Sequence, residues 1–441
     1  MAEGDTIFAL STAPGRAGIA VLRLSGPQAA AALRLLGGSV PPAREARLVT
    51  FRDPATGESI DRGLALHFPA PASVTGETVT ELHVHGSRAV VGALLDCLAR
   101  LPGLRLAEPG EFTRRAFLNG KLDLSEAEGL ADLVAAETAA QRRQALRQLD
   151  GALGRLTEGW RTRLLDAQAR LEAAIDFPDE DLPAELWERA RTEATALARE
   201  IGAHLADDRR GERLREGLSV AILGPPNAGK SSLMNALAQR EVAITAATAG
   251  TTRDVIEVAL DLGGYPVLLC DTAGLRPAAD PVEEEGVRRA RARAASADLR
   301  LVLYDATTPE DLDYLGELLG RDALLVANKT DLLPPGAPAP RGLALSVKTG
   351  AGLDAVLARL GAEVAARLVS GDAPLVTRAR HRAALDACGA ALLRAADADA
   401  SVPELAAEDL RAAARALGRI TGRVDVEDML DRLFAEFCIG K

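Results

Sequence analysis

The chain has 441 residues, 48% of them hydrophobic, which is enough for roughly two to four domains with substantial cores. Its 52 basic and 63 acidic side chains give a net charge of −11, which argues against broad, sequence-independent binding of nucleic acid but permits a local basic patch. No basic segment followed by an apolar core opens the chain, and no apolar run is long enough to cross a membrane. The four cysteines have no metal-type spacing, so we expect a reduced, cytoplasmic protein without a membrane partner.

Residues 1–118 are predicted to form an α+β domain. Helices are expected before Gly37 and over residues 89–101. Strands are expected at the apolar runs 19–24, 64–68 and 78–85. This mixture of nearby strands and helices is typical of the α+β class.

Two later segments have helical composition and flank a segment of a different kind. Residues 119–216 and 371–441 are rich in Ala, Leu, Arg and Glu at helical spacing, with breaks expected at Gly151 and Gly154. Between them, residues 217–370 alternate strands and helices, as a parallel α/β domain does, with strands expected at the apolar runs 218–223, 299–304 and 323–328. The simplest interpretation is a discontinuous all-α domain into which an α/β domain is inserted. Two separate helical domains are the alternative.

The segment Gly224–Ser231 reads GPPNAGKS and follows the apolar run 218–223. It fits G-x-x-x-x-G-K-[ST], a P-loop whose backbone amides surround phosphate groups. In such a loop, Lys230 reaches the outer phosphoryl oxygens and Ser231 is a ligand of Mg²⁺. The sequence therefore predicts a nucleotide site at the start of the inserted domain.

Further motifs follow the P-loop in the order that a GTPase needs: Thr251-Thr252, Asp271–Gly274, the guanine motif Asn328–Asp331, and Ser346–Lys348. An aspartate such as Asp331 accepts two parallel hydrogen bonds from the N1–H and 2-amino groups of guanine, which adenine does not offer. The sequence therefore predicts a GTP-binding α/β domain. Its expected nucleotide and switch residues are Asn227, Ala228, Gly229, Lys230, Ser231, Ser232, Ala246, Thr248, Gly250, Thr251, Thr252, Asp271, Thr272, Ala273, Gly274, Asn328, Lys329, Asp331, Ser346, Val347 and Lys348.

The residue after Gly274 is Leu275, which cannot orient an attacking water as the glutamine of Ras-type enzymes does. Hydrolysis therefore needs a water-orienting group and extra positive charge from elsewhere. Asn227 is a candidate ligand for a monovalent cation beside the phosphates. Glu283, in the acidic segment 280–285, is the candidate catalytic residue that holds the water. A solvated first helical turn is the alternative explanation of that segment.

Lysine is rare in this chain. Only five of the 52 basic residues are lysine, and three of these stand in the GTPase motifs. Lys121 and Lys441 are the other two. Because arginine serves everywhere else, a retained lysine suggests a site that needs a compact ammonium group. Coincidence is the alternative.

With these motifs and several longer ones, the chain resembles the bacterial and organellar tRNA-modification GTPase family MnmE, also called TrmE. The resemblance extends along nearly the whole sequence and includes an N-terminal glycine turn, a long central signature and a C-terminal Cys-Ile-Gly-Lys tail. The segments that carry it are Asp5–Ile7, Pro14–Arg16, Leu22–Gly26, Pro109–Leu124, Ala173–Glu180, Pro226–Leu233, Ala249–Asp254, Asp271–Arg276 and Phe437–Lys441.

The resemblance implies that the N-terminal domain forms a homodimer and binds 5-formyltetrahydrofolate or another one-carbon tetrahydrofolate. By resemblance, the folate contacts are Arg23, Glu81, Lys121 and Lys441. A carboxylate suits the N–H groups of the pterin, and cations suit the anionic glutamate tail. Surface charge on strands and loops is the alternative role of these residues.

The resemblance also implies that K⁺ drives association of two GTPase domains. By resemblance, the K⁺ ligands are Asn227, Ala246, Thr248 and Thr251. The segment Thr245–Ala249 lacks the hydroxyl or acidic residues often found in this loop, so backbone carbonyls would have to supply part of the ligation.

The family acts on tRNA with an FAD- and NADH-dependent partner, MnmG (GidA). The resemblance implies that the pair adds an aminomethyl or carboxymethylaminomethyl group to C5 of the wobble uridine, with a folate one-carbon unit. No dinucleotide-binding glycine fingerprint occurs in this chain, so the redox chemistry belongs to the partner. Cys438 is either a catalytic thiol near the folate or a packed residue that anchors the tail.

Two other functions compete with this interpretation. A GTP switch for ribosome assembly would normally carry a basic RNA-binding module, which this acidic chain lacks. A folate-sensing regulatory module with no role in modification is the second alternative.

Overall fold

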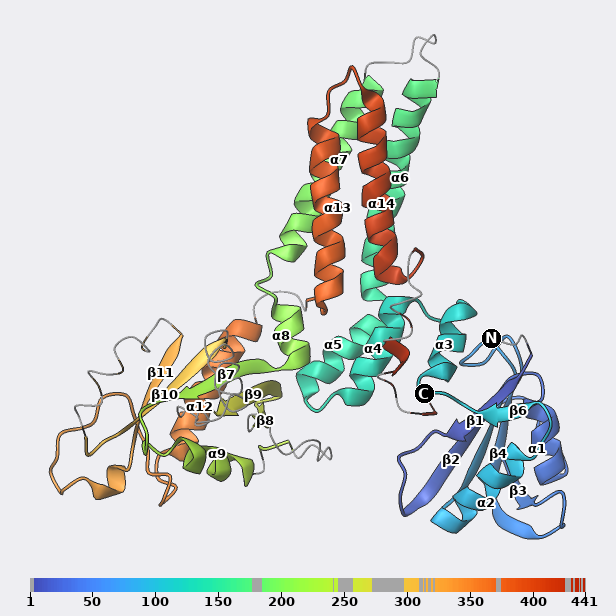
Figure 1. Cartoon of the computed structure of the whole chain (residues 1–441), viewed down its shortest axis with the longest axis horizontal. Coiled ribbons are helices and arrows are strands. Elements are labelled where there is room, and N and C mark those ends of the chain that lie inside the picture. The colour runs from blue at the N-terminus through green and yellow to red at the C-terminus, as the bar shows by residue number, and fades with distance from the viewer. Residues whose placement is uncertain are drawn as a thin grey trace, which may run out of the picture. The chain divides into compact units, whose positions relative to one another are not determined.

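The computed structural model describes residues 4–176, 185–240, 242–244, 257–271, 297–308, 312, 315, 319, 322–369, 374–424, 430, 433–435, 437 and 439–440. The chain divides into two compact units, which are coloured along the sequence in Figure 1. The first unit comprises Met1–Ala131, Leu149–Arg161 and Leu417–Lys441. The second unit comprises Asp132–Gln148 and Thr162–Ala416.

The first unit is built on a six-stranded sheet with the order β3-β4-β5-β2-β1-β6. Neighbouring strands are antiparallel except for β1 and β6, which are parallel. The strands are β1 (Thr6–Leu10), β2 (Ala17–Ser25), β3 (Arg47–Arg52), β4 (Ser59–Phe68), β5 (Val79–Gly86) and β6 (Leu104–Leu106). The predicted apolar runs in this region are confirmed as parts of β2, β4 and β5.

One face of this sheet is covered by α1 (Ala29–Gly37) and α2 (Arg88–Ala99). In β5, Leu82 and Val84 are buried in the core that these helices share with the sheet. Because successive side chains of a strand point to opposite faces, Glu81 and His83 lie on the other face. The sheet therefore separates an apolar core from a face that carries charged residues.

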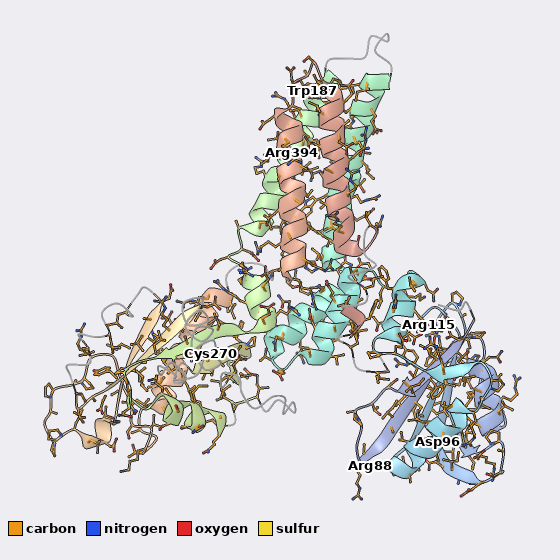
Figure 2. All side chains as sticks on the ribbon, in the orientation of Figure 1. Arg88, Asp96, Arg115, Trp187, Cys270 and Arg394 are labelled. Carbon is orange, nitrogen blue, oxygen red and sulfur yellow. The ribbon has the colours of Figure 1, made fainter. Side chains whose placement is uncertain are left out.

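A nearly buried arginine joins α3 (Glu111–Leu118) to the sheet region. The Arg115 guanidinium lies 2.8 Å from Asp5 Oδ1, 3.1 Å from Glu77 Oε2 and 3.0 Å from Glu111 Oε1 (Figure 2). Its side chain is 10% exposed, and a charge so sheltered needs this many carboxylate partners. The network stabilises α3 and the loop that carries Glu77.

The end of the chain returns to the first unit. Leu433, Phe434 and Phe437 pack with Leu124 of α4 (Leu124–Ala135) in one apolar cluster. Ile439 forms an isolated antiparallel bridge with Pro109. The C-terminal tail is thereby held against the segments around α3 and α4.

One predicted helix break is wrong. Gly151 has a φ of 76° and does precede α6 (Ala152–Asp176), but α6 runs through Gly154 without interruption. A Cβ on Gly154 would lie 2.5 Å from Asp123 Oδ2. This glycine therefore allows a close approach between side chain and helix, and it does not end a helix.

The second unit contains long helices on both sides of the inserted domain in sequence. Its helices outside the α/β part are α5 (Ala139–Leu149), α7 (Glu185–Leu205), α8 (Arg210–Glu216) and α13 (Ala379–Asp397), with the later turns of α6 and most of α14 (Pro403–Thr421). α7 and α13 pack along their lengths (Figure 1). The Arg163 guanidinium joins α6 to α7 through Glu193 and Glu200, at 2.6 and 2.7 Å.

The α/β part is a six-stranded sheet with the order β12-β11-β10-β7-β9-β8, in which only β8 and β9 are antiparallel. Buried apolar residues of α9 (Lys230–Ala238) and α12 (Leu353–Leu368) complete one core with this sheet. Its strands are β7 (Leu218–Leu223), β8 (Glu257–Leu262), β9 (Tyr265–Asp271), β10 (Leu299–Asp305), β11 (Ala323–Asn328) and β12 (Leu343–Ala344). Parallel strands β7, β10 and β11 end at the same edge, where open α/β sheets bind ligands.

Within the described residues, no helix is long and apolar enough to span a membrane.

Candidate functional site

The predicted P-loop connects β7 to α9, and its backbone geometry requires glycine at two positions. A Cβ on Gly224 would lie 2.0 Å from the carbonyl oxygen of Leu303, and one on Gly229 would lie 2.3 Å from Asn328 Nδ2. Gly229 has a φ of 99°, and Asn227 is also left-handed with a φ of 66°. The loop therefore packs its backbone against β10 and β11 more closely than any side chain would permit.

Lys230 is the first residue of α9 and bends back over the loop. Its Nζ donates hydrogen bonds to the carbonyl oxygens of Gly224 and Pro225, each at 2.9 Å. Ser231 and Ser232 are exposed in the first turn of the helix, whereas Ala228 is buried. Unpaired N–H groups and the helix dipole make such a helix start favourable for anions.

Asn328, at the end of β11, ties three parts of the site together. Its Nδ2 donates to the carbonyl oxygen of Ala228 at 2.8 Å, and its Oδ1 accepts from the N–H of Val347 at 3.1 Å. The side chain is 3% exposed. The P-loop, β11 and the Ser346–Lys348 segment are thus joined by one buried amide, with donor and acceptor both satisfied.

The remaining residues of the guanine motif surround this amide. Ser346 Oγ donates to Asp331 Oδ1 at 2.7 Å, which orients a carboxylate that is itself exposed. Lys329 Nζ lies 2.7 Å from Asp305 Oδ2, and Lys348 is exposed. Asp331 is held in place with its carboxylate open to a ligand.

Asp305 is a site residue that the sequence interpretation missed. Burial alone would raise its pKa, but hydrogen bonds from Lys329 and Thr307 outweigh this effect and hold the pKa below its usual value. Asp305 is therefore a carboxylate that anchors the lysine of the guanine motif. Its place at the carboxyl end of the apolar strand 299–305 was the signal available in the sequence.

Several predicted residues fall outside the described residues, so their positions stay predictions. Asp271 ends β9, but its side chain is among those not described. The others are Ala246, Thr248, Gly250, Thr251, Thr252, Thr272, Ala273, Gly274, Glu283, Cys438 and Lys441.

In the first unit, Arg23 and Glu81 form a pair on the face of the sheet opposite α1 and α2. They are directly opposed on β2 and β5, and Arg23 Nε lies 3.0 Å from Glu81 Oε1. His83 Nε2 lies 3.0 Å from the other carboxylate oxygen, and the Arg23 guanidinium lies 5.9 Å from the centre of the Phe112 ring. Phe112 was not singled out from the sequence, although it stands within the central signature.

Burial alone would raise the pKa of Glu81, but hydrogen bonds and charge from His83 and Arg23 outweigh it and hold the pKa below its usual value. The side chains of Glu81 and Arg23 are 15% and 24% exposed. An ionised carboxylate and a guanidinium are therefore presented together, partly sheltered from water. This combination can bind a ligand that has both N–H donors and an anionic group.

Of the other two predicted folate contacts, Lys121 lies within the described residues and Lys441 does not. Lys121 is exposed, and its Nζ donates to the carbonyl oxygen of Pro71 at 2.9 Å. The residue before Lys441 is described: Ser11 Oγ donates to the Gly440 carbonyl oxygen at 3.0 Å. A Cβ on Gly440 would lie 2.2 Å from the carbonyl oxygen of Leu10, which neighbours the Arg23 strand. No group of three or more His, Cys, Asp or Glu side chains in the described part of the chain is arranged to hold a metal ion.

The strand–loop–helix with Lys230 and the Asn328–Asp331 motif define the inserted domain as a P-loop domain of the GTPase class. Comparison with known families agrees. The family described as MnmE helical domain matches residues 124–438, and the one described as GTP-binding protein TrmE N-terminus matches residues 6–121. The chain belongs to the MnmE family of tRNA modification GTPases.

Relatives match over their full length. The tRNA modification GTPase MnmE of Parvibaculum lavamentivorans is 60% identical over 99% of this chain and 100% of its own. The MnmE of Rhodospirillum rubrum is 56% identical over 99% of each chain. These matches confirm a multidomain layout with a TrmE-type N-terminal part and a helical domain.

Solved structures align only in part. A structure of Aquifex aeolicus Era bound to GDP and AlF4⁻ is 25% identical over 42% of this chain and 69% of its own, with a TM-score of 0.27.

Proposed function

We propose that this chain hydrolyses GTP as part of a tRNA-modifying enzyme. The observation that carries the proposal is the Asn328 amide, which joins the P-loop to the two segments predicted to bind guanine, within a chain that matches MnmE relatives end to end. Asp331, oriented by Ser346, would select guanine, because adenine has no N1–H and no 2-amino group to donate to the carboxylate. Lys230 would neutralise charge on the outer phosphates.

The metal ions of the proposed reaction fit the chemistry of the available residues. The Ser231 hydroxyl, with Thr252 from the sequence motif, would hold Mg²⁺, which prefers oxygen ligands. Asn227 is exposed in the loop with a left-handed backbone, so its amide oxygen can serve a monovalent cation. The remaining proposed K⁺ ligands are Ala246, Thr248 and Thr251. Such ions supply positive charge next to the phosphates.

Because Leu275 cannot orient water, we assign that role to Glu283 on the basis of its sequence position. If K⁺ completes the site, initial rates of GTP hydrolysis will be higher in KCl than in NaCl at equal ionic strength. Equal rates in the two salts would count against the proposed K⁺ site.

The folate part of the proposal rests on the first unit. The Arg23–Glu81 pair offers an anion-binding and an N–H-binding group on one sheet face, and the tail that leads to Lys441 is held beside Leu10. With Lys121, these residues would bind 5-formyltetrahydrofolate or a related one-carbon folate. Cys438 would lie in the same tail, as a catalytic thiol or as an anchor.

In the full proposal, a homodimer of this chain works with an FAD- and NADH-dependent partner of the MnmG (GidA) type. Together they would add an aminomethyl or carboxymethylaminomethyl group to C5 of the wobble uridine in tRNA. The folate would supply the one-carbon unit, and the partner would supply the redox chemistry.

The test is mass spectrometry of tRNA nucleosides from cells that lack the gene. We expect the C5 aminomethyl-type nucleosides to disappear and to return with the wild-type gene but not with Lys230→Ala. Arg394→Ala serves as the matched control, because the Arg394 side chain is exposed on α13 (Figure 2), and this variant should restore the modified nucleosides.

Unchanged nucleosides would contradict the proposed role in modification. Altered ribosome assembly in the same cells would then favour the GTP-switch alternative. Folate binding without either phenotype would favour a folate-sensing module.

A further inference from the structure

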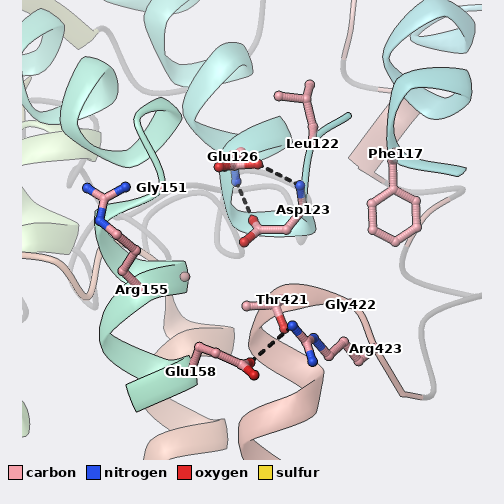
Figure 3. A pocket seen from close by; sticks show the side chains of 11 residues that line it. Phe117, Leu122, Asp123, Glu126, Gly151, Arg155, Glu158, Thr421, Gly422 and Arg423 are labelled. Carbon is pink, nitrogen blue, oxygen red and sulfur yellow. Dashed lines mark hydrogen bonds and ion pairs between the residues drawn. The ribbon is translucent and has the colours of Figure 1, made fainter. Parts of the chain in front are cut away.

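The first unit contains a cavity of about 450 Å³ that takes no part in the GTP or folate proposals (Figure 3). It lies between the end of α3, the start of α4, the first turns of α6 and the segment that follows α14. Its volume is within the range of small-molecule sites. Charged side chains from three of these segments line it.

Two carboxylates form one wall of the cavity. Asp123 Oδ1 accepts the N–H of Glu126, and Glu126 Oε2 accepts the N–H of Asp123, each at 2.8 Å. This reciprocal capping of α4 uses one oxygen of each group for the helix. The second oxygens lie over two glycines, Gly154 within α6 and Gly151 just before it: a Cβ on Gly154 would be 2.5 Å from Asp123 Oδ2, and one on Gly151 would be 2.6 Å from Glu126 Oε1. The chain thus has room for two neighbouring carboxylates that larger residues would displace.

This acidic wall favours a cation. Burial, with a smaller contribution from the charge of Asp123, raises the pKa of Glu126, although the Asp123 N–H and Arg155 act in the opposite direction. A positively charged group placed between the two carboxylates would relieve this unfavourable situation. Phe117 also lines the cavity, and aromatic rings attract ammonium groups (Figure 3).

Two guanidinium groups also line the cavity. Arg155 is exposed, and its NH1 donates to the Asp150 carbonyl oxygen at 2.5 Å, which leaves several of its five donors for other partners. Arg423 NH2 lies 3.1 Å from Glu158 Oε2, and these side chains are 52% and 41% exposed. Arg155 is therefore the group best placed to receive an anion.

We propose that this cavity binds a small zwitterion, whose ammonium group lies against Asp123 and Glu126 and whose acidic group accepts hydrogen bonds from Arg155. A simple anion would meet the carboxylates, and a simple cation would leave the guanidinium unused, so neither is complementary to the whole cavity. Free amino acids and phosphorylated amines share this chemistry. The inference concerns binding alone and does not depend on GTP hydrolysis.

Calorimetric titration of the full-length protein, without nucleotide or tRNA, tests the proposal. The probes are serine, γ-aminobutyrate and phosphoethanolamine, with methylamine and acetate as the two halves of a zwitterion. We expect at least one zwitterion to bind about tenfold or more tightly than either half compound. A preference for phosphoethanolamine over both amino acids would identify a phosphorylated amine as the ligand class.

Single substitutions locate the site. Glu126→Gln and Arg155→Gln should each weaken binding by about tenfold or more, because each removes a charge-assisted hydrogen bond. Arg88→Gln, an exposed change on α2 of the same unit (Figure 2), should leave affinity unchanged. If Glu126→Gln lowers the melting temperature, the Arg155→Gln variant alone tests the site, because Arg155 is exposed and its replacement should not disturb the fold. No zwitterion with a tighter affinity than the half compounds, or full affinity in Arg155→Gln, would overturn the proposal without affecting the proposed GTPase.

Discussion

Asp132 and Arg378 form an ion pair at 2.7 Å, and the same carboxylate oxygen also accepts from Arg215 Nε at 3.0 Å. Arg215 lies just before β7, where the chain enters the inserted α/β domain. Arg378 lies just after the chain leaves it. One side chain of α4 therefore holds both connections of the inserted domain.

The backbone is also closely packed at these two connections. A Cβ on Gly211 of α8 would lie 2.1 Å from the carbonyl oxygen of Val376. Gln144 Nε2 donates to the Gly211 carbonyl oxygen at 3.1 Å, and Thr377 Oγ1 donates to Gln148 Oε1 at 2.7 Å. Helix α5 thus supports the incoming and the outgoing segment, so the α/β domain is joined to the helices at a packed junction.

Asp132→Ala should destabilise this junction. The Asp132 side chain is 16% exposed, and its removal takes away the carboxylate that two sheltered guanidinium groups share. We expect a loss of about 2–4 kcal/mol in the free energy of unfolding. Urea unfolding followed by circular dichroism measures the shift in midpoint.

The matched control for this variant is Asp354→Ala, which breaks a pair with Arg240 in which the aspartate is 84% exposed. An exposed pair of this kind contributes less than about 1 kcal/mol. If both variants shift the midpoint equally, Asp132 does not hold the junction.

Gly229→Ala should greatly weaken nucleotide binding. The added Cβ would lie 2.3 Å from Asn328 Nδ2, and the φ of 99° is unfavourable for alanine. The loop must then move away from Asn328, which should weaken binding of a fluorescent GTP analogue by about 100-fold or more. Gly361→Ala, inside α12 with its nearest neighbour atom at 4.0 Å, should bind like the wild type. Wild-type affinity in Gly229→Ala would show that the contact with Asn328 is dispensable.

The Arg23–Glu81 pair should give a defined dependence of stability on pH. The folded-state pKa of Glu81 is lowered, so the pair contributes fully above the unfolded-state pKa, which is about 4.3. Its contribution is lost as the pH falls through the lowered folded-state pKa. Thermal unfolding of wild type and Glu81→Gln from pH 3 to 7 should show a constant difference near neutrality that shrinks below about pH 4. A difference that grows towards acid pH would contradict this assignment.

Cys388 should be inert in the folded protein. Its side chain is completely buried in α13, and burial raises the pKa of its thiol to about 12. At pH 8 only on the order of one thiol in 10⁴ is then ionised, and reagents have no access. Alkylation followed by peptide mass spectrometry should label half-buried Cys270 before Cys388, which should react only after unfolding. Equal labelling of the two folded-state thiols would show that α13 opens readily.

The strands of the α/β part were predictable because their signals are local. The apolar runs at 218–223, 299–304 and 323–328 correspond to β7, β10 and β11 almost residue by residue. A buried strand can be recognised from a few neighbouring residues, because it appears in the sequence as a short run of apolar side chains. The same reasoning failed at Gly154, since a glycine that ends a helix and one that makes room for Asp123 look alike in sequence.

By itself, the sequence determined the order of motifs, and with it the class of nucleotide domain and the residue types available for phosphate and guanine. Only the tertiary structure decided which distant residues share one site. Asn328 meets Ala228 100 positions away, Arg378 meets Asp132 across 246, and Gly440 meets Ser11 across 429. The chemistry of a motif depends on residue types and their spacing along the chain, which the sequence gives directly. These contacts depend instead on how whole helices and sheets pack, which no short stretch of residues encodes.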